Sequence, residues 1–413
     1  MPLALLRHGL FPARQPARHL PPPAPLKKHY DVVIIGGGGH GLATAYFLAR
    51  YHGITNVAVL EKAYLGGGNT ARNTAVIRAN YVTPGSVRFY AESVKLYETL
   101  SQELDFNILF SQRGQLTLAH TDSAMRGFRL RAEVNRRCGV ESVMIGSDEI
   151  RRMVPSLNLV PAERYPVLGG LWHPPGGVAR HDAVAWGFAR RAAERGVDIH
   201  QHTEVTGLSV EGGKVKGVQT NRGMVGCGTV VQAVAGASSL VAAMAGLRLP
   251  IVSFPLQAMV TQPLKPFVDP LVSSPQFHLY ISQTPRGEVV IGGGSDPYPL
   301  YSTRATLELK ESLIQHVVEL FPCLREVKLL RQWAGITDMT PDYSPIMGKT
   351  EIDGFLLDAG WGTWGFKATP ICGKTMAELI ATNRTPALIE EFSVERFRTF
   401  RLVNEMGATA ASH

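Results

Sequence analysis

The chain has 413 residues, of which 45% are hydrophobic and 18% are charged; this composition excludes a disordered protein and is ordinary for a globular enzyme of two or three domains. The formal net charge is +8, but five of the basic residues lie within the first 30 residues, which contain no acid. The rest of the chain has no basic cluster with interleaved aromatic residues and no apolar run near the roughly 20 residues of a membrane span, so we expect neither nucleic-acid binding nor a membrane span.

The first 28 residues have an unusual composition. They are rich in proline and contain basic but no acidic residues. An organellar transit peptide can have this composition, and so can an extended tail that lies on the protein or on a partner. The sequence leaves both interpretations open, and we treat residues 1–28 as an extended basic tail.

Residues 30–61 have the pattern of a strand, a glycine turn, a helix and a second strand that ends in an acid. The first strand, residues 31–35, leads into the turn GGGGHG. In this pattern Gly36 permits a tight turn, Gly38 lets the backbone approach a pyrophosphate, and Gly41 lets the helix pack closely on the strand. Free N–H groups at the start of the helix then bind the phosphates. The residues of the turn that we expect at the cofactor are Gly36, Gly38, Gly39, His40 and Gly41.

Glu61 directly follows the second strand, residues 57–60. A carboxylate at that position accepts hydrogen bonds from the ribose hydroxyls of adenosine, and it would repel the extra phosphate of NADP. The whole pattern therefore predicts a dinucleotide-binding βαβ unit rather than an empty glycine turn. By itself it does not distinguish FAD from NAD.

A second stretch of small and hydrogen-bonding residues spans 66–74 and can let the backbone approach a flat ligand. Four of its side chains are expected at the cofactor: Asn69, Thr70, Arg72 and Asn73. Farther along, apolar residues at helical spacing between Tyr90 and Leu104 predict an amphipathic helix whose apolar stripe belongs to the core. An alternating strand is predicted at residues 115–119.

The middle of the chain alternates between predicted helix and predicted strand. A helix over residues 183–194 is predicted to have Asp182 as its N-cap and to stop at Gly196. Four strands are predicted after it, at residues 197–200, 203–210, 215–220 and 229–234.

The following segment is rich in strands, of which 277–282 and 288–291 are the clearest, and has one predicted helix at 306–320. A short strand at 355–358 then leads through a glycine-rich turn, residues 360–367, into a final helix.

Several of these motifs together resemble the D-amino-acid oxidase and sarcosine oxidase family. They are the N-terminal fingerprint, the mid-chain helix–strand unit, the stretch WAGITDMTPD at 333–342, and the C-terminal turn that ends in Gly-Phe-Lys. Within this family, and over roughly residues 28–400, the chain is most similar to the beta subunits of heterotetrameric sarcosine oxidases. The most specific stretches are GGHGLATAY at 38–46, FSQRG at 110–114 and RHDAVAW at 180–186.

The resemblance implies an α/β fold, with a Rossmann-like FAD-binding domain and an inserted α+β substrate domain built on a mostly antiparallel sheet. The FAD-binding domain would be discontinuous, formed by residues 29–80, 175–248 and 340–400. The substrate domain would be formed by residues 81–174 and 249–339. Residues 401–413 would be a C-terminal tail.

The resemblance also implies two flavins. FAD would be noncovalent, because residues 333–348 contain no cysteine of the kind that tethers FAD in the single-chain relatives. FMN would be attached covalently to His181, at the junction with an alpha subunit. The residues alone favour a surface or capping role for this histidine, although the positive end of a helix suits an anionic flavin. Val205, Gly362, Gly365 and Lys367 are further residues that we expect at FAD.

Two cations, Arg78 and Lys367, match the family residues that hold the substrate carboxylate. Arg can form a bidentate pair with a planar carboxylate and Lys adds a point charge, so together they could orient an N-methyl amino acid over a flavin. From the residues alone, either could be a solvated surface charge or half of an internal salt bridge. His278 and Tyr280 could line the same pocket or only pack in a strand.

The function implied by the resemblance is that of a beta subunit of a sarcosine oxidase complex, an FAD-dependent amine oxidoreductase. Sarcosine, or a similar N-methyl amino acid, would be demethylated to glycine and formaldehyde. Electrons would pass from FAD to FMN and then to oxygen, giving hydrogen peroxide. The strand at 289–292 lacks the lysine with which simpler relatives promote the reaction with oxygen, which supports transfer to FMN. Alpha, gamma and delta subunits would complete a heterotetramer.

Two alternatives remain open. The chain could be a single-chain FAD dehydrogenase for another secondary or tertiary amino acid, such as dimethylglycine or proline. It could also be a scaffold subunit whose flavin is only structural.

The four cysteines lie far apart, without a CxxC pair and without a histidine at zinc-ligand spacing. We therefore predict free thiols, no metal site and a reducing, cytoplasmic location.

Overall fold

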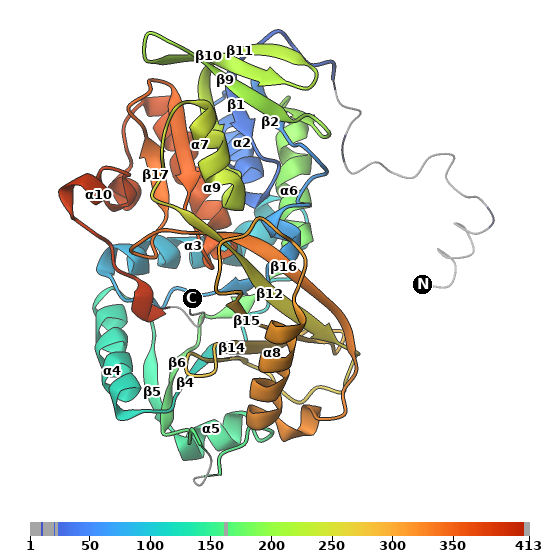
Figure 1. Cartoon of the computed structure of the whole chain (residues 1–413), viewed down its shortest axis with the longest axis vertical. Coiled ribbons are helices and arrows are strands. Elements are labelled where there is room, and N and C mark those ends of the chain that lie inside the picture. Colours follow the sequence, from blue (N-terminus) through green and yellow to red (C-terminus); the bar gives the residue numbers. More distant parts are fainter. Residues whose placement is uncertain (1–9, 11–19, 21–23, 161–163, 409–413) are drawn as a thin grey trace.

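The computed structural model describes residues 10, 20, 24–160 and 164–408 (Figure 1). Most of the predicted basic tail, residues 1–28, lies outside the described residues, as do the last five residues of the predicted C-terminal tail. None of the helices described is both long enough and apolar enough to cross a membrane.

The first of two eight-stranded sheets is built around the predicted βαβ unit. β1 (His29–Ile35), α2 (Gly39–Tyr51) and β2 (Val57–Leu60) follow one another as predicted. β1 pairs in parallel with β2 on one side and with β11 (Gly223–Gln232) on the other. All four residues of β2 are buried, which explains why its sequence is apolar throughout rather than alternating.

Strands from residues 29–60, 198–232 and 346–359 meet in this sheet, whose central order is β17-β18-β11-β1-β2-β8. The remaining strands are β8 (Asp198–His200), β9 (Val205–Glu211), β10 (Lys214–Thr220), β17 (Ile346–Lys349) and β18 (Phe355–Ala359). The predicted hairpin joins β9 to β10 through Gly212 and Gly213, both with positive φ. The C-terminal end of the chain thus returns to the sheet that its N-terminal end begins.

Helices pack closely on this sheet at the glycine turn. α2 contacts both α6 (His181–Ala193) and α9 (Gly365–Thr382). α3 (Pro84–Glu103) packs on α9, and its predicted apolar stripe is buried as expected. Figure 1 shows α3 running between the two halves of the molecule.

The second sheet has the order β16-β12-β15-β14-β13-β4-β6-β5. Its neighbouring strands are antiparallel except for β13 and β4, which are parallel. Its strands are β4 (Gln115–Ala119), β5 (Val143–Gly146), β6 (Gly169–His173), β12 (Val252–Thr261), β13 (Leu271–Ser274), β14 (Leu279–Gln283), β15 (Val289–Ser295) and β16 (Leu329–Met339). α8 (Leu307–Leu320) packs on β14 and β15, and α4 (Asp122–Arg137) on β4, β5 and β6.

Shorter elements connect the two sheets and cover their ends. β3 (Val76–Ile77) pairs with β7 (Gly177–Val178) as a separate two-stranded ribbon. The others are η1 (Asn69–Arg72), α5 (Ser147–Met153), η2 (Ala235–Ala237), α7 (Ser238–Met244), η3 (Pro322–Leu324), η4 (Ala387–Phe392), α10 (Arg396–Thr399) and η5 (Met406–Ala408).

One predicted helix start is wrong. α6 begins at His181 with Arg180 as its N-cap, and Asp182 lies inside the first turn, where its carboxylate pairs with Arg180 at 2.8 Å. The chain is still extended at Arg180, because the N–H of that residue donates to the carbonyl of Ile108 at 2.8 Å. This contact with a distant segment sets the boundary, so local capping preferences could not predict it.

Candidate functional site

The glycine turn between β1 and α2 leaves no room for side chains. Gly36 has φ +112°, and a Cβ there would lie 2.2 Å from the carbonyl oxygen of Ala233. A Cβ on Gly41 would lie 2.1 Å from the carbonyl oxygen of Gly36. α2 starts without a side-chain cap and without an acidic residue in its first turn. Its positive end is therefore available to an anionic group such as a pyrophosphate.

Two of the side chains predicted at the cofactor lie directly beside this turn. The carboxylate of Glu61, at the end of β2, accepts the N–H of Gly37 at 2.9 Å. The hydroxyl of Thr70, in η1, accepts the N–H of Gly39 at 3.0 Å. The structure therefore brings the acid and the second small-residue stretch to the start of α2.

The other polar side chains of that stretch shape its backbone. Asn69 pairs with Ile336 in β16, donating to its carbonyl at 2.5 Å and accepting its N–H at 3.1 Å. Arg72 donates to the carbonyl of Gly68 at 2.8 Å, and Asn73 accepts the N–H of Ala75 at 2.6 Å. These contacts fix the segment between the glycine turn and the second sheet.

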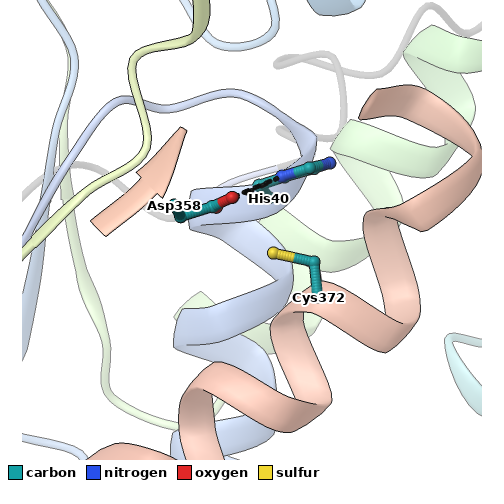
Figure 2. Close-up of side chains that lie close together, drawn as sticks. All are labelled: His40, Asp358 and Cys372. Atoms are coloured by element: carbon teal, nitrogen blue, oxygen red, sulfur yellow. Dashed lines mark hydrogen bonds and ion pairs between the residues drawn. The ribbon is translucent and has the colours of Figure 1, made fainter. Parts of the chain in front are cut away.

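His40, in the first turn of α2, joins the glycine turn to the C-terminal glycine-rich turn (Figure 2). Its Nδ1 lies 3.0 Å from the carboxylate of Asp358, and its Nε2 lies 2.7 Å from the carbonyl oxygen of Gly365. Both partners accept hydrogen bonds, so both ring nitrogens must donate, as in the imidazolium form. Burial opposes that charge, but Asp358 and the two hydrogen bonds outweigh it and raise the pKa of His40 above its usual 6.5.

The Cys372 thiol on α9 points toward the same pair (Figure 2), and the ligand atoms of the three residues lie within 4.8 Å of one another. Burial raises the pKa of Cys372 well above its usual value, so the sulfur carries its proton, whereas a metal needs the thiolate. Trp361 also donates to Asp358 from its indole N–H. These side chains already form hydrogen bonds with one another. We therefore interpret the group as a hydrogen-bonded bridge between the glycine turn and the C-terminal glycine-rich turn.

Gly365 begins α9, Gly362 lies in the turn before it, and Val205 begins β9. Gly362 has φ +52°, and its N–H donates to the carbonyl of Asp338 at 3.0 Å. Burial raises the pKa of the Asp338 carboxyl to about 6. The Val205 side chain is buried in the core of the first sheet.

Arg78 and Lys367 come from opposite ends of the chain and are both only 5% exposed. Burial lowers the pKa of Lys367 well below its usual 10.5, and the charge of Arg78 lowers it further, so the two cations influence each other inside the protein. The ammonium donates to the carbonyl of Thr363 at 3.2 Å, and among the residues that the structure describes Lys367 forms no ion pair. The guanidinium lies over the ring of Tyr81, 4.4 Å from its centroid. A solvated surface charge is thereby excluded for both.

His181 is half-buried at the first position of α6. Its Nε2 lies 3.2 Å from the carbonyl oxygen of Ala71 in η1, the same short helix that touches the glycine turn through Thr70. Burial lowers the pKa of His181 below its usual value, so the ring is neutral at neutral pH. Because the carbonyl accepts from Nε2, the lone pair is on Nδ1.

Sequence reasoning missed three buried polar residues that contact the loop after Arg78: Arg131 in α4, His173 at the end of β6, and Glu405 near the C-terminus. No local pattern marks them, because each is defined by what it contacts in the folded chain. Tyr280, named as a possible pocket residue, accepts a hydrogen bond from the Thr74 hydroxyl at 3.0 Å, beside the ribbon that carries Arg78.

Comparison with known proteins gives consistent relationships. The family described as FAD dependent oxidoreductase matches residues 31–379. The chain is 49% identical to the sarcosine oxidase subunit beta of Rhodobacter capsulatus, over 94% of this chain and 93% of that protein. It is 47% identical to the sarcosine oxidase subunit beta of Rhizobium meliloti, over 99% of this chain and 98% of that protein. Among solved structures, the L-proline dehydrogenase from P. horikoshii superimposes with a TM-score of 0.86 at 32% identity, covering 91% of this chain and 100% of that one.

Proposed function

Because the chain belongs to the FAD-dependent oxidoreductase family, in the group that contains the sarcosine oxidase beta subunits, we propose that it binds FAD and oxidises sarcosine or a similar N-methyl amino acid. The observation that carries this proposal is a pair of buried basic residues: Arg78 directly follows β3 and Lys367 lies in the first turn of α9, and these two elements pack on each other. A small carboxylate is the ligand that suits such a pair.

The residues around the glycine turn fit noncovalent FAD. The uncapped start of α2 would hold the pyrophosphate, Glu61 would accept the ribose hydroxyls, and the turn at Gly362 and Gly365 would approach the flavin. Bound FAD would supply the electron acceptor. The protein's part would be to orient the substrate and keep water away from it.

Arg78 and Lys367 would orient the substrate by its carboxylate. A guanidinium can grip both carboxylate oxygens, and the nearby ammonium adds a point charge. Each charge-assisted bond is worth about 1.5–3 kcal/mol where water is excluded. Lys367 is held for this task because the carbonyls of Phe366 and Lys367 itself accept hydrogen bonds from Tyr97 and Ser93 of α3, both at 2.6 Å.

We further propose that His181 carries a covalent FMN. A neutral imidazole with its lone pair on Nδ1 is the form that can bond to a flavin, and η1 connects this histidine to the FAD turn over a short path. Electrons would then leave FAD for FMN and reach oxygen there, giving hydrogen peroxide. Alpha, gamma and delta subunits would complete the complex.

In this proposal the first sheet belongs to a discontinuous FAD-binding domain, formed by residues 29–80, 175–248 and 340–400. The second sheet belongs to an inserted substrate domain, formed by residues 81–174 and 249–339. Its predominantly antiparallel pairing supports this division, and so does the hydrogen bond from the N–H of Ala79 to His173 at the end of β6. Cys138, Cys227, Cys323 and Cys372 are free thiols. A reducing, cytoplasmic location is part of the proposal.

The similarity to an L-proline dehydrogenase structure favours a second candidate, an FAD dehydrogenase that acts on proline. Proline is also a secondary amine with an adjacent carboxylate, so the same two cations could bind it. The two substrates differ beyond the amine, because proline has a ring where sarcosine has a methyl group.

One set of measurements on the assembled complex tests the proposal. Anaerobic sarcosine should bleach the flavin absorbance and proline should not; bleaching by proline alone would select the second candidate, and bleaching by neither would leave only a structural flavin. Acid precipitation should retain one flavin on the wild-type chain and none on His181→Ala, whereas the exposed control His52→Ala should keep it. A flavin retained by His181→Ala would disprove the covalent assignment.

A further inference from the structure

The five residues after Arg78, residues 79–83, connect β3 to α3 as a loop without regular secondary structure, of which residues 79–81 are buried and residues 82–83 are half-buried. Such a loop carries backbone polar groups that need partners. Its partners here are buried side chains that come from three distant parts of the chain. Arg78 itself donates to the carbonyl of Asn80 at 3.1 Å and to its side-chain oxygen at 2.9 Å, so the position of this loop sets the position of the guanidinium.

β6 and α4 hold the first half of the loop. The N–H of Ala79 donates to Nε2 of His173 at 3.1 Å, and Nδ1 of that ring donates to the carbonyl of Glu141 at 2.7 Å. Arg131 donates to the carbonyl of Asn80 from Nε, at 2.6 Å, and from Nη2. The guanidiniums of Arg78 and Arg131 thus converge on one carbonyl oxygen.

The segment around Glu405, near the C-terminus, holds the second half of the loop; we call it the C-terminal segment. The carboxylate of Glu405, which is fully buried, accepts the N–H of Val82 at 2.9 Å and the N–H of Thr83 at 2.7 Å. Asn135 of α4 completes the set by donating to the carbonyl of Tyr81 at 2.7 Å. The segment around Glu405, which lies beside α4 in Figure 1, therefore helps to hold the loop that follows Arg78.

The charged groups around residues 79–83 are consistent with these hydrogen bonds. Arg131 is 4% exposed, and among the described residues it forms no ion pair. Burial and the charge of Arg78 lower the pKa of Arg131 to about 9, and the charge of Glu405 opposes that shift. Burial and the two guanidiniums lower the pKa of His173 to about 3, so it stays a neutral acceptor for Ala79. Because its pKa stays well above 7, Arg131 remains charged at neutral pH.

We propose that Arg131 and Glu405 are positioning residues for Arg78: they fix residues 79–83 from α4 and from the C-terminal segment, and so set where the guanidinium meets the substrate carboxylate. This inference rests on the proposed function, since it assigns these residues to the carboxylate end of that site. By this proposal the C-terminal segment contributes to substrate binding indirectly, through the position of Arg78.

The test uses the assembled complex and two variants. Glu405→Gln keeps the size of the side chain but removes its charge and one acceptor, and Arg131→Lys keeps the charge but loses the two-donor fork. Acetate, which offers only the carboxylate, is titrated by the change in flavin absorbance. We expect its Kd and the KM for sarcosine to rise about tenfold or more in both variants, while kcat changes by less than about threefold. The exposed controls Glu395→Gln and Arg129→Lys, on the same segments, should match the wild type.

A double-variant comparison separates positioning from general stability. If Glu405 acts through Arg78, Glu405→Gln should lower kcat/KM for sarcosine by less than about twofold in an Arg78→Met background. Full additivity there, or wild-type acetate affinity in both single variants, would overturn the proposal. Failure of both variants to form flavin-loaded protein would also overturn it, because the residues would then serve folding. A wild-type complex that responds to neither acetate nor sarcosine would instead contradict the proposed function.

Discussion

Removing Arg78 and Lys367 singly and together tests whether they act on the same carboxylate. The variants are Arg78→Met and Lys367→Met, with Arg88→Met and Lys374→Met as exposed controls on α3 and α9. Because both native side chains are only 5% exposed, solvent screens their charges little. Loss of one charge-assisted bond of about 1.5–3 kcal/mol should lower kcat/KM for sarcosine about 10- to 150-fold in each single variant.

The double variant tests whether the two side chains bind the same carboxylate. When one cation is removed, the carboxylate is already misplaced, so removing the second should cost less than it does alone. We expect a coupling energy of about 0.5–3 kcal/mol, measured as kcat/KM from anaerobic flavin reduction with FAD content checked in every variant. Coupling below about 0.3 kcal/mol would refute a shared ligand. Equal losses for a substrate amine without a carboxylate would refute it as well.

Two further predictions concern the fold around the site. Gly373→Ala should destabilise the protein by about 1–3 kcal/mol, because the new Cβ would lie 2.5 Å from the Cβ of Ala43, where α9 packs on α2. The destabilisation would be seen as a lower Tm. The control Gly127→Ala, at an open position of α4, should not lower the Tm. The raised pKa of His40 predicts that its bond to Asp358 stabilises the fold fully below about pH 6.5, and that this stabilisation is lost as the pH rises through the higher folded-state pKa. Asp358→Asn should flatten that part of the stability–pH curve in chemical denaturation, and an unchanged curve would contradict the assignment.

The sequence predicted the elements whose signals are local. The βαβ unit was found because an apolar strand, a glycine turn and a distal acid follow one another within one short segment, and β1, α2 and β2 confirm it. The apolar stripe of α3 has the helical period, and the helix that carries it is present. β11 begins at Gly223 rather than at 229, because its first residues alternate through glycines that give no apolar pattern.

The sequence did not predict α4, and with it two residues that bind the loop after Arg78, Arg131 and Asn135, were missed. That helix is rich in arginine, and its buried positions include Phe128, Arg131 and Asn135, so its inner face is half polar. A rule that searches for apolar periodicity treats such a segment as solvated. The role of Glu405 was not predicted for a related reason. The local sequence around an acid near the C-terminus does not indicate that its carboxylate accepts two backbone N–H groups of a distant loop.

Buried charge links these observations to function. Lys367 and Arg131 are basic side chains held away from water, and neither forms an ion pair within the described part of the chain. Burial lowers the pKa of both groups. Removing such charges from water costs free energy that hydrogen bonds to carbonyls recover only in part. In the proposed site, a carboxylate bound by Arg78 and Lys367 would recover more of this free energy at Lys367, since it supplies a negative charge in a region of low dielectric constant. On the proposed function, the fold gives up some stability to keep Arg78 and Lys367 available to the substrate. On the same proposal, Glu405 and Arg131 hold residues 79–83, and with them Arg78, in place.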